Sequence, residues 1–182
     1  YTGFQDAYSV VINGLRRLEY RGYDSAGIVL ESTEKTFEVA KTKGKVDDLV
    51  SISKELKGKA NVGMGHTRWA THGVPSDRNS HPHLSNNGKI ALVHNGIIEN
   101  YDTIKTMLTE KGFTFQSETD TEVLVNLIQY FMDVNPDLDF PTAVRYALNE
   151  VYGAYAITVM HYDFPGILVV GRLGSPLAIG LG

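Results

Sequence analysis

Apolar residues in this chain form strand-like pairs and helix-like blocks, and they do not follow a strict strand–helix alternation. The strand-like runs fall at residues 26–30, 36–42, 61–66, 90–93, 154–160, 167–171 and 177–181. Strands that follow one another in pairs favour antiparallel sheets, and the amphipathic helices between the pairs would cover them. We therefore expect an α+β fold in a single domain that spans residues 1–182.

Composition limits the classes of partner. The 182 residues include 17 Lys and Arg and 21 Asp and Glu, so no basic excess indicates nucleic acid. No apolar run approaches the roughly 18 residues of a membrane span. The chain contains no cysteine, which excludes disulfides and is compatible with the cytoplasm. It starts at Tyr1 and ends inside an apolar segment, so we expect a domain truncated at both ends.

Two polar segments stand where strands are expected to end, and each offers groups that bind a small polar ligand. HTRWATHG, residues 66–73, supplies a guanidinium, an indole, hydroxyls and imidazoles. HNGIIEN, residues 94–100, supplies a carboxamide followed by glycine. We expect the two segments to form one pocket for a small zwitterion, with an oxyanion position beside it.

The first segment contains two candidate binding residues. Arg68 could hold a carboxylate through two parallel hydrogen bonds, and the alternative is a surface salt bridge. Trp69, the only tryptophan, is either a core anchor or a lid over a bound ligand.

The second segment contains an Asn95-Gly96 pair, which usually marks a tight hairpin turn. Ile97 and Ile98 follow, however, and no return strand is apparent. The alternative is that the Asn95 side chain and the Gly96 N–H point at one spot, because an oxyanion hole requires two such donors.

Asp120 lies in SETDTE, residues 117–122, at the expected start of a helix. Thr119 and Glu122 have the spacing of a capping box, and a carboxylate in the first turn is favourable in itself. If those two residues supply the cap, Asp120 is left to bind a substrate ammonium.

Five of the six histidines lie between His66 and His94, which raises the possibility of a metal-dependent hydrolase. No acidic residue lies between Asp77 and Glu99, and no H-E-x-x-H spacing occurs. We therefore expect these histidines to make loop and core hydrogen bonds, with no metal and no cofactor.

Taken in order, six segments resemble the glutaminase domain of the glucosamine-6-phosphate synthase family, a class II glutamine amidotransferase domain. The resemblance implies an N-terminal-nucleophile fold, in which two stacked antiparallel sheets lie between helical layers in the order α/β/β/α. The related phosphoribosyl-pyrophosphate amidotransferases share this fold and are the alternative family. The segments are RRLEYRGYDSAG (16–27), HTRWATHG (66–73), HPH (81–83), VHNGIIEN (93–100), SETDTE (117–122) and GSPLAIGLG (174–182).

The resemblance implies hydrolysis of L-glutamine to glutamate. In the family, the ammonia passes to a C-terminal sugar isomerase domain that converts fructose 6-phosphate to glucosamine 6-phosphate. That domain is absent from these 182 residues. The resemblance also implies a homodimer formed through it.

The resemblance assigns a role to each candidate residue. It places Asn95 and the Gly96 N–H in the oxyanion hole, and Gly96 also near the substrate ammonium. It gives Asp120 to the α-ammonium, and Arg68, with Thr71 and His72 nearby, to the α-carboxylate.

Two further residues and one departure complete the comparison. Trp69 matches a lid residue, and Arg21 matches a position that supports the nucleophile. The family's nucleophile is an N-terminal cysteine about five residues before the segment that aligns with Tyr1, and the chain as given does not contain it. A non-enzymatic amino-acid-binding module therefore stays open as an interpretation of this chain.

Overall fold

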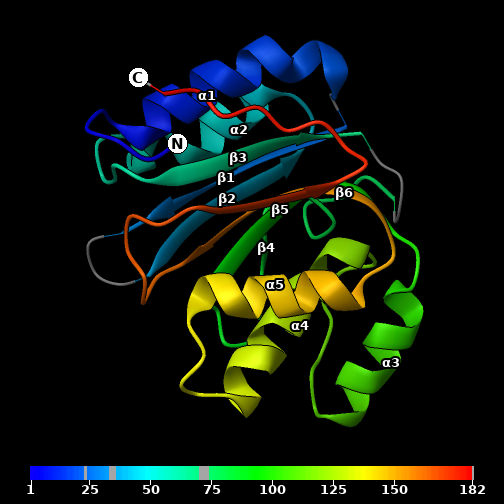
Figure 1. Cartoon of the computed structure of the whole chain (residues 1–182). Helices are drawn as coiled ribbons and strands as arrows, with labels where there is room; N and C mark the ends of the chain where they lie inside the picture. Colours follow the sequence, from blue (N-terminus) through cyan, green and yellow to red (C-terminus); the bar gives the residue numbers. More distant parts are fainter. Residues whose placement is uncertain (23, 33–35, 70–73, 182) are drawn as a thin grey trace.

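Two antiparallel sheets lie face to face, and helices cover the outer side of each sheet (Figure 1). The structure is a computed structural model, and it describes residues 1–22, 24–32, 36–69 and 74–181. The order helix, sheet, sheet, helix confirms the α/β/β/α class that the sequence predicts.

The first sheet has the strand order β2-β1-β3, with both pairings antiparallel. Its strands are β1 (Ser25–Glu31), β2 (Phe37–Lys43) and β3 (Gly63–Arg68). The helices α1 (Ala7–Leu18) and α2 (Val46–Ser53) pack on its outer face, and each continues into a short 3-10 turn, Glu19–Arg21 and Lys54–Leu56. Strand β3 lies at the edge of this sheet, where it can accept a further strand.

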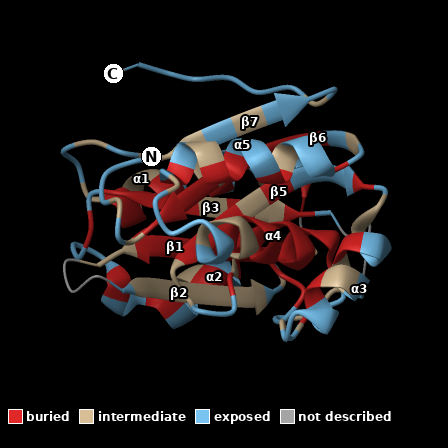
Figure 2. Cartoon of the chain, turned by 60° about the horizontal axis from the view of Figure 1, so that its bottom comes forward, coloured by how far each residue is buried: buried red, intermediate tan, exposed pale blue. Residues whose placement is uncertain are grey.

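The second sheet has the order β4-β5-β6-β7. Its strands are β4 (His83–Leu84), β5 (Ile90–Ile98), β6 (Gly153–His161) and β7 (Val169–Leu173). The helices α3 (Tyr101–Glu110), α4 (Asp120–Val134) and α5 (Phe140–Glu150) cover its outer face. The first ten residues of α4 are all buried, because this helix is packed between β5 and its two neighbouring helices (Figure 2).

A small apolar cluster holds the two sheets together. It consists of Val29, Val62, Met64, Ala91 and Met160, all buried between the facing strands. Each fully buried valine or methionine side chain contributes roughly 1.5–3 kcal/mol to the stability of the fold. The sheets are thus fixed relative to each other near the residues where β3 and β5 begin.

The structure corrects two details of the predicted strands. The expected strand at 177–181 is wrong: this segment makes no ladder, and the exposed fractions of Ile179 and Leu181 are 71% and 97%. A run of apolar residues forms a strand only where a neighbouring strand is available to pair with it. None of the described residues pairs with segment 177–181. The strand expected at 90–93 instead continues to Ile98.

No helix among the described residues is long and apolar enough to cross a membrane.

Candidate functional site

A cavity of about 410 Å³ opens where β3, β5 and α4 meet. Each of these elements brings a different chemical group to it: a guanidinium from β3, a carboxamide from β5 and a carboxylate from α4. The cavity is lined by Leu18, Arg21, His66, Thr67, Arg68, Trp69, His81, His94, Asn95, Gly96, Thr119, Asp120, Thr121, Ser175 and Pro176. The structure therefore brings together six of the eight site residues expected from the sequence.

Arg68 is the last residue of β3, and only 4% of its surface is exposed. Burial lowers the pKa of its guanidinium, and the nearby charges of Asp24 and Asp120 act in the opposite direction. A guanidinium stays charged at any physiological pH. The cavity wall thus contains a largely buried positive charge, and Arg68 does not lie on the exposed surface.

Asp120 is the first residue of α4 and is 4% exposed. Its Oδ2 accepts a hydrogen bond of 2.8 Å from the Ile98 N–H, which fixes the carboxylate against the end of β5. His94 Nδ1 lies 3.9 Å from Asp120 Oδ1. The cavity therefore contains a buried negative group as well as a buried positive one.

The cap of α4 differs in part from the predicted capping box. Thr119 accepts a hydrogen bond from the Glu122 N–H, as expected. The Glu122 carboxylate, however, accepts from the N–H groups of Gln116 and Ser117 rather than from Thr119. The Thr119 N–H instead donates to Ser117 Oγ. The cap still leaves the Asp120 side chain directed at the cavity.

Asn95 and Gly96 lie inside β5, where they pair with Ala156 and Tyr155 of β6. The hairpin-turn interpretation is therefore wrong, since the return strand β6 comes from far along the chain. Gly96 has φ +135°, and a Cβ at this position would lie 2.0 Å from the carbonyl oxygen of Ala154. Only glycine fits such a backbone, which turns the strand locally at the cavity wall.

Trp69 and Arg21 lie at the rim of the cavity, and both are exposed. The exposed fraction of Trp69 is 62%, so the core-anchor interpretation is wrong. Thr71 and His72, the other residues expected beside the carboxylate, lie outside the described residues.

Buried histidines form the floor of the cavity. The rings of His66 and His81 stack at 4.3 Å, and His83 meets His81 edge-on at 5.0 Å. Burial lowers the pKa of His66 to about 4 and lowers the pKa values of His81 and His83 well below 6.5, so all three are neutral near pH 7.

Three of the histidines between His66 and His94 make hydrogen bonds of the kind that the sequence predicts for loop and core histidines. His66 Nε2 bonds Asn95 Oδ1, His83 Nε2 bonds Thr119 Oγ1, and His94 Nδ1 bonds Thr121 Oγ1. Across the described ranges, no group of three or more His, Cys, Asp or Glu side chains is arranged to hold a metal ion.

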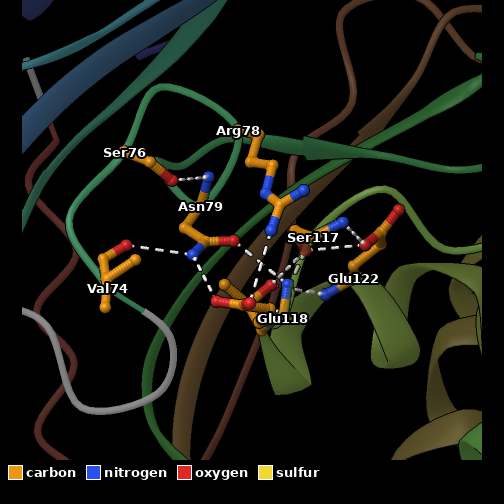
Figure 3. Close-up of polar contacts among 8 residues, drawn as sticks. Val74, Ser76, Arg78, Asn79, Ser117, Glu118 and Glu122 are labelled. Atoms are coloured by element: carbon orange, nitrogen blue, oxygen red, sulfur yellow. Dashed lines mark hydrogen bonds and ion pairs between the residues drawn. The ribbon is translucent and has the colours of Figure 1, made fainter.

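A second network fixes the start of α4 to the segment that precedes β4 (Figure 3). The buried Asn79 side chain donates to Val74 O at 2.9 Å and to Glu118 Oε2 at 3.1 Å, and its Oδ1 accepts from the Glu118 N–H at 3.0 Å. Arg78 adds an exposed ion pair with Glu118. Because Glu118 is two residues before Asp120, this network helps to set the position of the cavity carboxylate.

Sequence reasoning missed several cavity residues. His81 was expected only as a structural histidine, and His66 was placed in the pocket segment without a role. His66 and Arg68 are two residues apart on β3, a spacing that puts both side chains on the same face of the sheet. Leu18, Ser175 and Pro176 line the cavity from the ends of α1 and β7, and nothing local in the sequence predicts that contact.

Comparison with known proteins gives a consistent result. Residues 53–134 match the glutamine amidotransferase domain family. The glutamine–fructose-6-phosphate aminotransferases of Bacteroides thetaiotaomicron and Chlorobaculum tepidum are 52% and 49% identical to this chain over its whole length, which corresponds to 30% of theirs. The Bacillus subtilis glutamine phosphoribosylpyrophosphate amidotransferase structure has a TM-score of 0.74 and 30% identity, covering 88% of this chain and 34% of that one.

The fold, the cavity and these matches define the chain as a glutamine amidotransferase domain of the N-terminal-nucleophile type. Within that class, the chain matches the glutamine–fructose-6-phosphate aminotransferase of Bacteroides thetaiotaomicron more closely than the phosphoribosylpyrophosphate enzyme, with 52% against 30% identity. The chain spans about 30% of the length of these relatives.

Proposed function

We propose that the cavity binds L-glutamine and hydrolyses its side-chain amide, and that the whole protein uses the ammonia to convert fructose 6-phosphate to glucosamine 6-phosphate. The observation that supports this most strongly is the pair of opposite buried charges. Arg68 would bind the α-carboxylate, with Thr71 and His72 nearby, and Asp120 would bind the α-ammonium, with Gly96 close by. A peptide-bound glutamine lacks both charges, so two fixed partners would select the free amino acid.

The register of β3 supports a nucleophile that precedes Tyr1. The Tyr1 N–H donates to Gly63 O, the Gly63 N–H donates to Tyr1 O, and Thr2 bridges Val62. In an antiparallel ladder, each residue added before Tyr1 pairs with one residue further along β3. The fifth residue before Tyr1 would therefore lie opposite Arg68, and directly opposite residues share a face of the sheet. A cysteine there would direct its thiol into the cavity, beside Arg21.

The chemistry follows from these positions. The thiolate attacks the side-chain carbonyl carbon of glutamine, with the N-terminal amine as its base. Asn95 Nδ2 and the Gly96 N–H stabilise the oxyanion that forms. The N-terminal ammonium then gives the thiol's proton to the amide nitrogen, the C–N bond breaks, and ammonia leaves a thioester. Water hydrolyses this thioester to glutamate and restores the thiol. Trp69, at the rim, would cover the bound substrate.

Several further properties belong to the same proposal. The rest of the protein would include a C-terminal sugar isomerase domain, and two copies would associate through that domain. The enzyme would act in the cytoplasm, without a cofactor. The phosphoribosylpyrophosphate amidotransferases remain the second candidate, but their 30% identity favours them less.

The test is glutamine-dependent ammonia release by the full-length protein. We expect glutamate and ammonia in equal amounts, and labelling of the N-terminal cysteine by a diazoketone analogue of glutamine. Replacement of that cysteine by alanine is the control and should abolish both signals. Ammonia release that persists in the alanine variant would contradict the proposed nucleophile.

A further inference from the structure

His66 makes one direct contact with the proposed oxyanion hole. Its Nε2 lies 2.9 Å from Asn95 Oδ1, across the space between β3 and β5. A carboxamide oxygen can only accept a hydrogen bond, so His66 must contribute an N–H at Nε2. This bond assigns the two branches of the carboxamide: the oxygen faces His66, and the NH₂ group faces the other way.

The His66 ring is held in the orientation that this bond requires. The residue is buried, with 9% of its surface exposed, and its ring stacks on His81 at 4.3 Å with an angle of 22° between the planes. Burial lowers its pKa to about 4, so the ring carries a single proton near pH 7. That proton lies on the nitrogen that meets Asn95. A ring with a pKa this low that donates from Nε2 is unsuited to act as a general base.

We infer that His66 is a positioning residue that holds the Asn95 carboxamide with its NH₂ group toward the cavity. The inference rests on the proposed function, because it gives a role to the donor that the oxyanion would use. Without His66, the carboxamide of the exposed Asn95 can rotate by 180° about its terminal bond. In that state its oxygen would face the developing negative charge, and only the Gly96 N–H would remain as a donor.

The experiment compares two substitutions of His66 in the full-length enzyme. His66→Phe keeps a flat ring that can stack on His81 but removes the N–H. His66→Gln places an amide N–H close to the position of Nε2. We expect His66→Phe to lower kcat about 10-fold or more with KM changed less than 3-fold, since loss of an oxyanion donor costs about 10²–10³. His66→Gln should recover at least one third of kcat.

A double-mutant cycle with Asn95→Ala separates positioning from a general structural effect. Asn95→Ala alone should lower kcat about 10²–10³-fold and leave KM nearly unchanged. If His66 acts through Asn95, adding His66→Phe should then lower kcat less than 2-fold further. Circular dichroism shows whether His66→Phe folds. If it does not fold, His66→Leu replaces it as the variant without an N–H donor.

The outcomes distinguish the two proposals. An inactive wild-type enzyme would overturn the proposed function, and the inference about His66 with it. If the wild type is active and the fold losses of kcat in His66→Phe and Asn95→Ala multiply in the double variant, only the inference is overturned. Equal losses of kcat in His66→Phe and His66→Gln, or a loss expressed in KM alone, would overturn it too.

Discussion

At the scale of single residues, two charged side chains are buried and still face the same cavity. Arg68 and Asp120 are each 4% exposed, and both line the same space. Burying a charge is costly unless a partner of opposite sign is present. Free glutamine carries an ammonium and a carboxylate on one carbon, so it would offer each of these two side chains a further charge of opposite sign.

Arg68→Lys tests the carboxylate site in the full-length enzyme. Lysine keeps the charge but cannot make two parallel hydrogen bonds. We expect KM for glutamine to rise about 10- to 100-fold, corresponding to about 1.5–3 kcal/mol for a charged hydrogen bond. Steady-state kinetics would show this, with the exposed Arg145→Lys on α5 as the matched control. An unchanged KM would remove Arg68 from the site.

The buried histidines predict a pH dependence of stability. The pKa of His66 is about 4 in the folded chain and 6.5 in the unfolded chain, so the unfolded state binds more protons between these values. The free energy of unfolding should therefore decrease as pH falls from 6.5 to 4, by up to about 1.4 kcal/mol per pH unit for this group. Urea unfolding at pH 6.5, 5.5 and 4.5 measures the slope.

His66→Gln is the control for this pH effect, because it removes one titrating group and keeps an N–H donor. The variant should lose stability less steeply with falling pH than the wild type. Identical slopes in the two proteins would show that His66 is not held neutral in the folded chain.

At the scale of elements, the site depends on where α4 begins. Asn79 is fully buried and links Val74 to Glu118, just before the α4 cap (Figure 3). We expect Asn79→Ala to lower the free energy of unfolding by about 1–3 kcal/mol, since it removes the three hydrogen bonds that the buried Asn79 side chain makes to Val74 and Glu118. It should also raise KM for glutamine through displacement of Asp120.

Arg78→Ala is the matched control for Asn79→Ala, because Arg78 contacts the same Glu118 from an exposed position. Its effect on unfolding should stay below about 1 kcal/mol. Thermal and chemical unfolding of both variants decide the point. Equal effects of the two substitutions would mean that the hydrogen bonds of Asn79 stabilise the fold no more than the exposed ion pair of Arg78.

The elements also show how far sequence reasoning reached. The strands at 26–30 and 36–42 were predictable because their apolar spacing is local. The extension of β5 to Ile98 was not, because it depends on pairing with β6, whose residues lie more than 50 positions later. The short strand β4 likewise exists only through its pairing with β5.

The candidate site was predictable as a set of residue types and not as a geometry. Arg68, Asn95 and Asp120 could be chosen from their motifs, and all three line the cavity. The link from His66 to Asn95 joins two strands of different sheets, so only the packing of the sheets reveals it.

At the scale of the whole molecule, binding and catalysis would depend on different parts of the protein. Its 182 residues contain no cysteine, and Tyr1 has no nucleophile suited to the reaction. A protein of residues 1–182 alone should therefore release no ammonia from glutamine, while it still binds glutamine weakly through Arg68 and Asp120. An ammonia assay on material of verified mass checks this, and clear activity would contradict the cysteine mechanism.

The central claim is that one cavity recognises both charges of free L-glutamine. Isothermal titration calorimetry tests it most directly on the full-length protein with its N-terminal cysteine replaced by alanine, so that glutamine binds without being hydrolysed. The ligands are glutamine and two analogues that keep the carboxamide. 4-Aminobutanamide lacks the carboxylate, and glutaramate lacks the ammonium. We predict that each analogue binds at least about 10-fold more weakly than glutamine, since each loses one charged contact. Equal affinity for glutamine and either analogue would contradict the account.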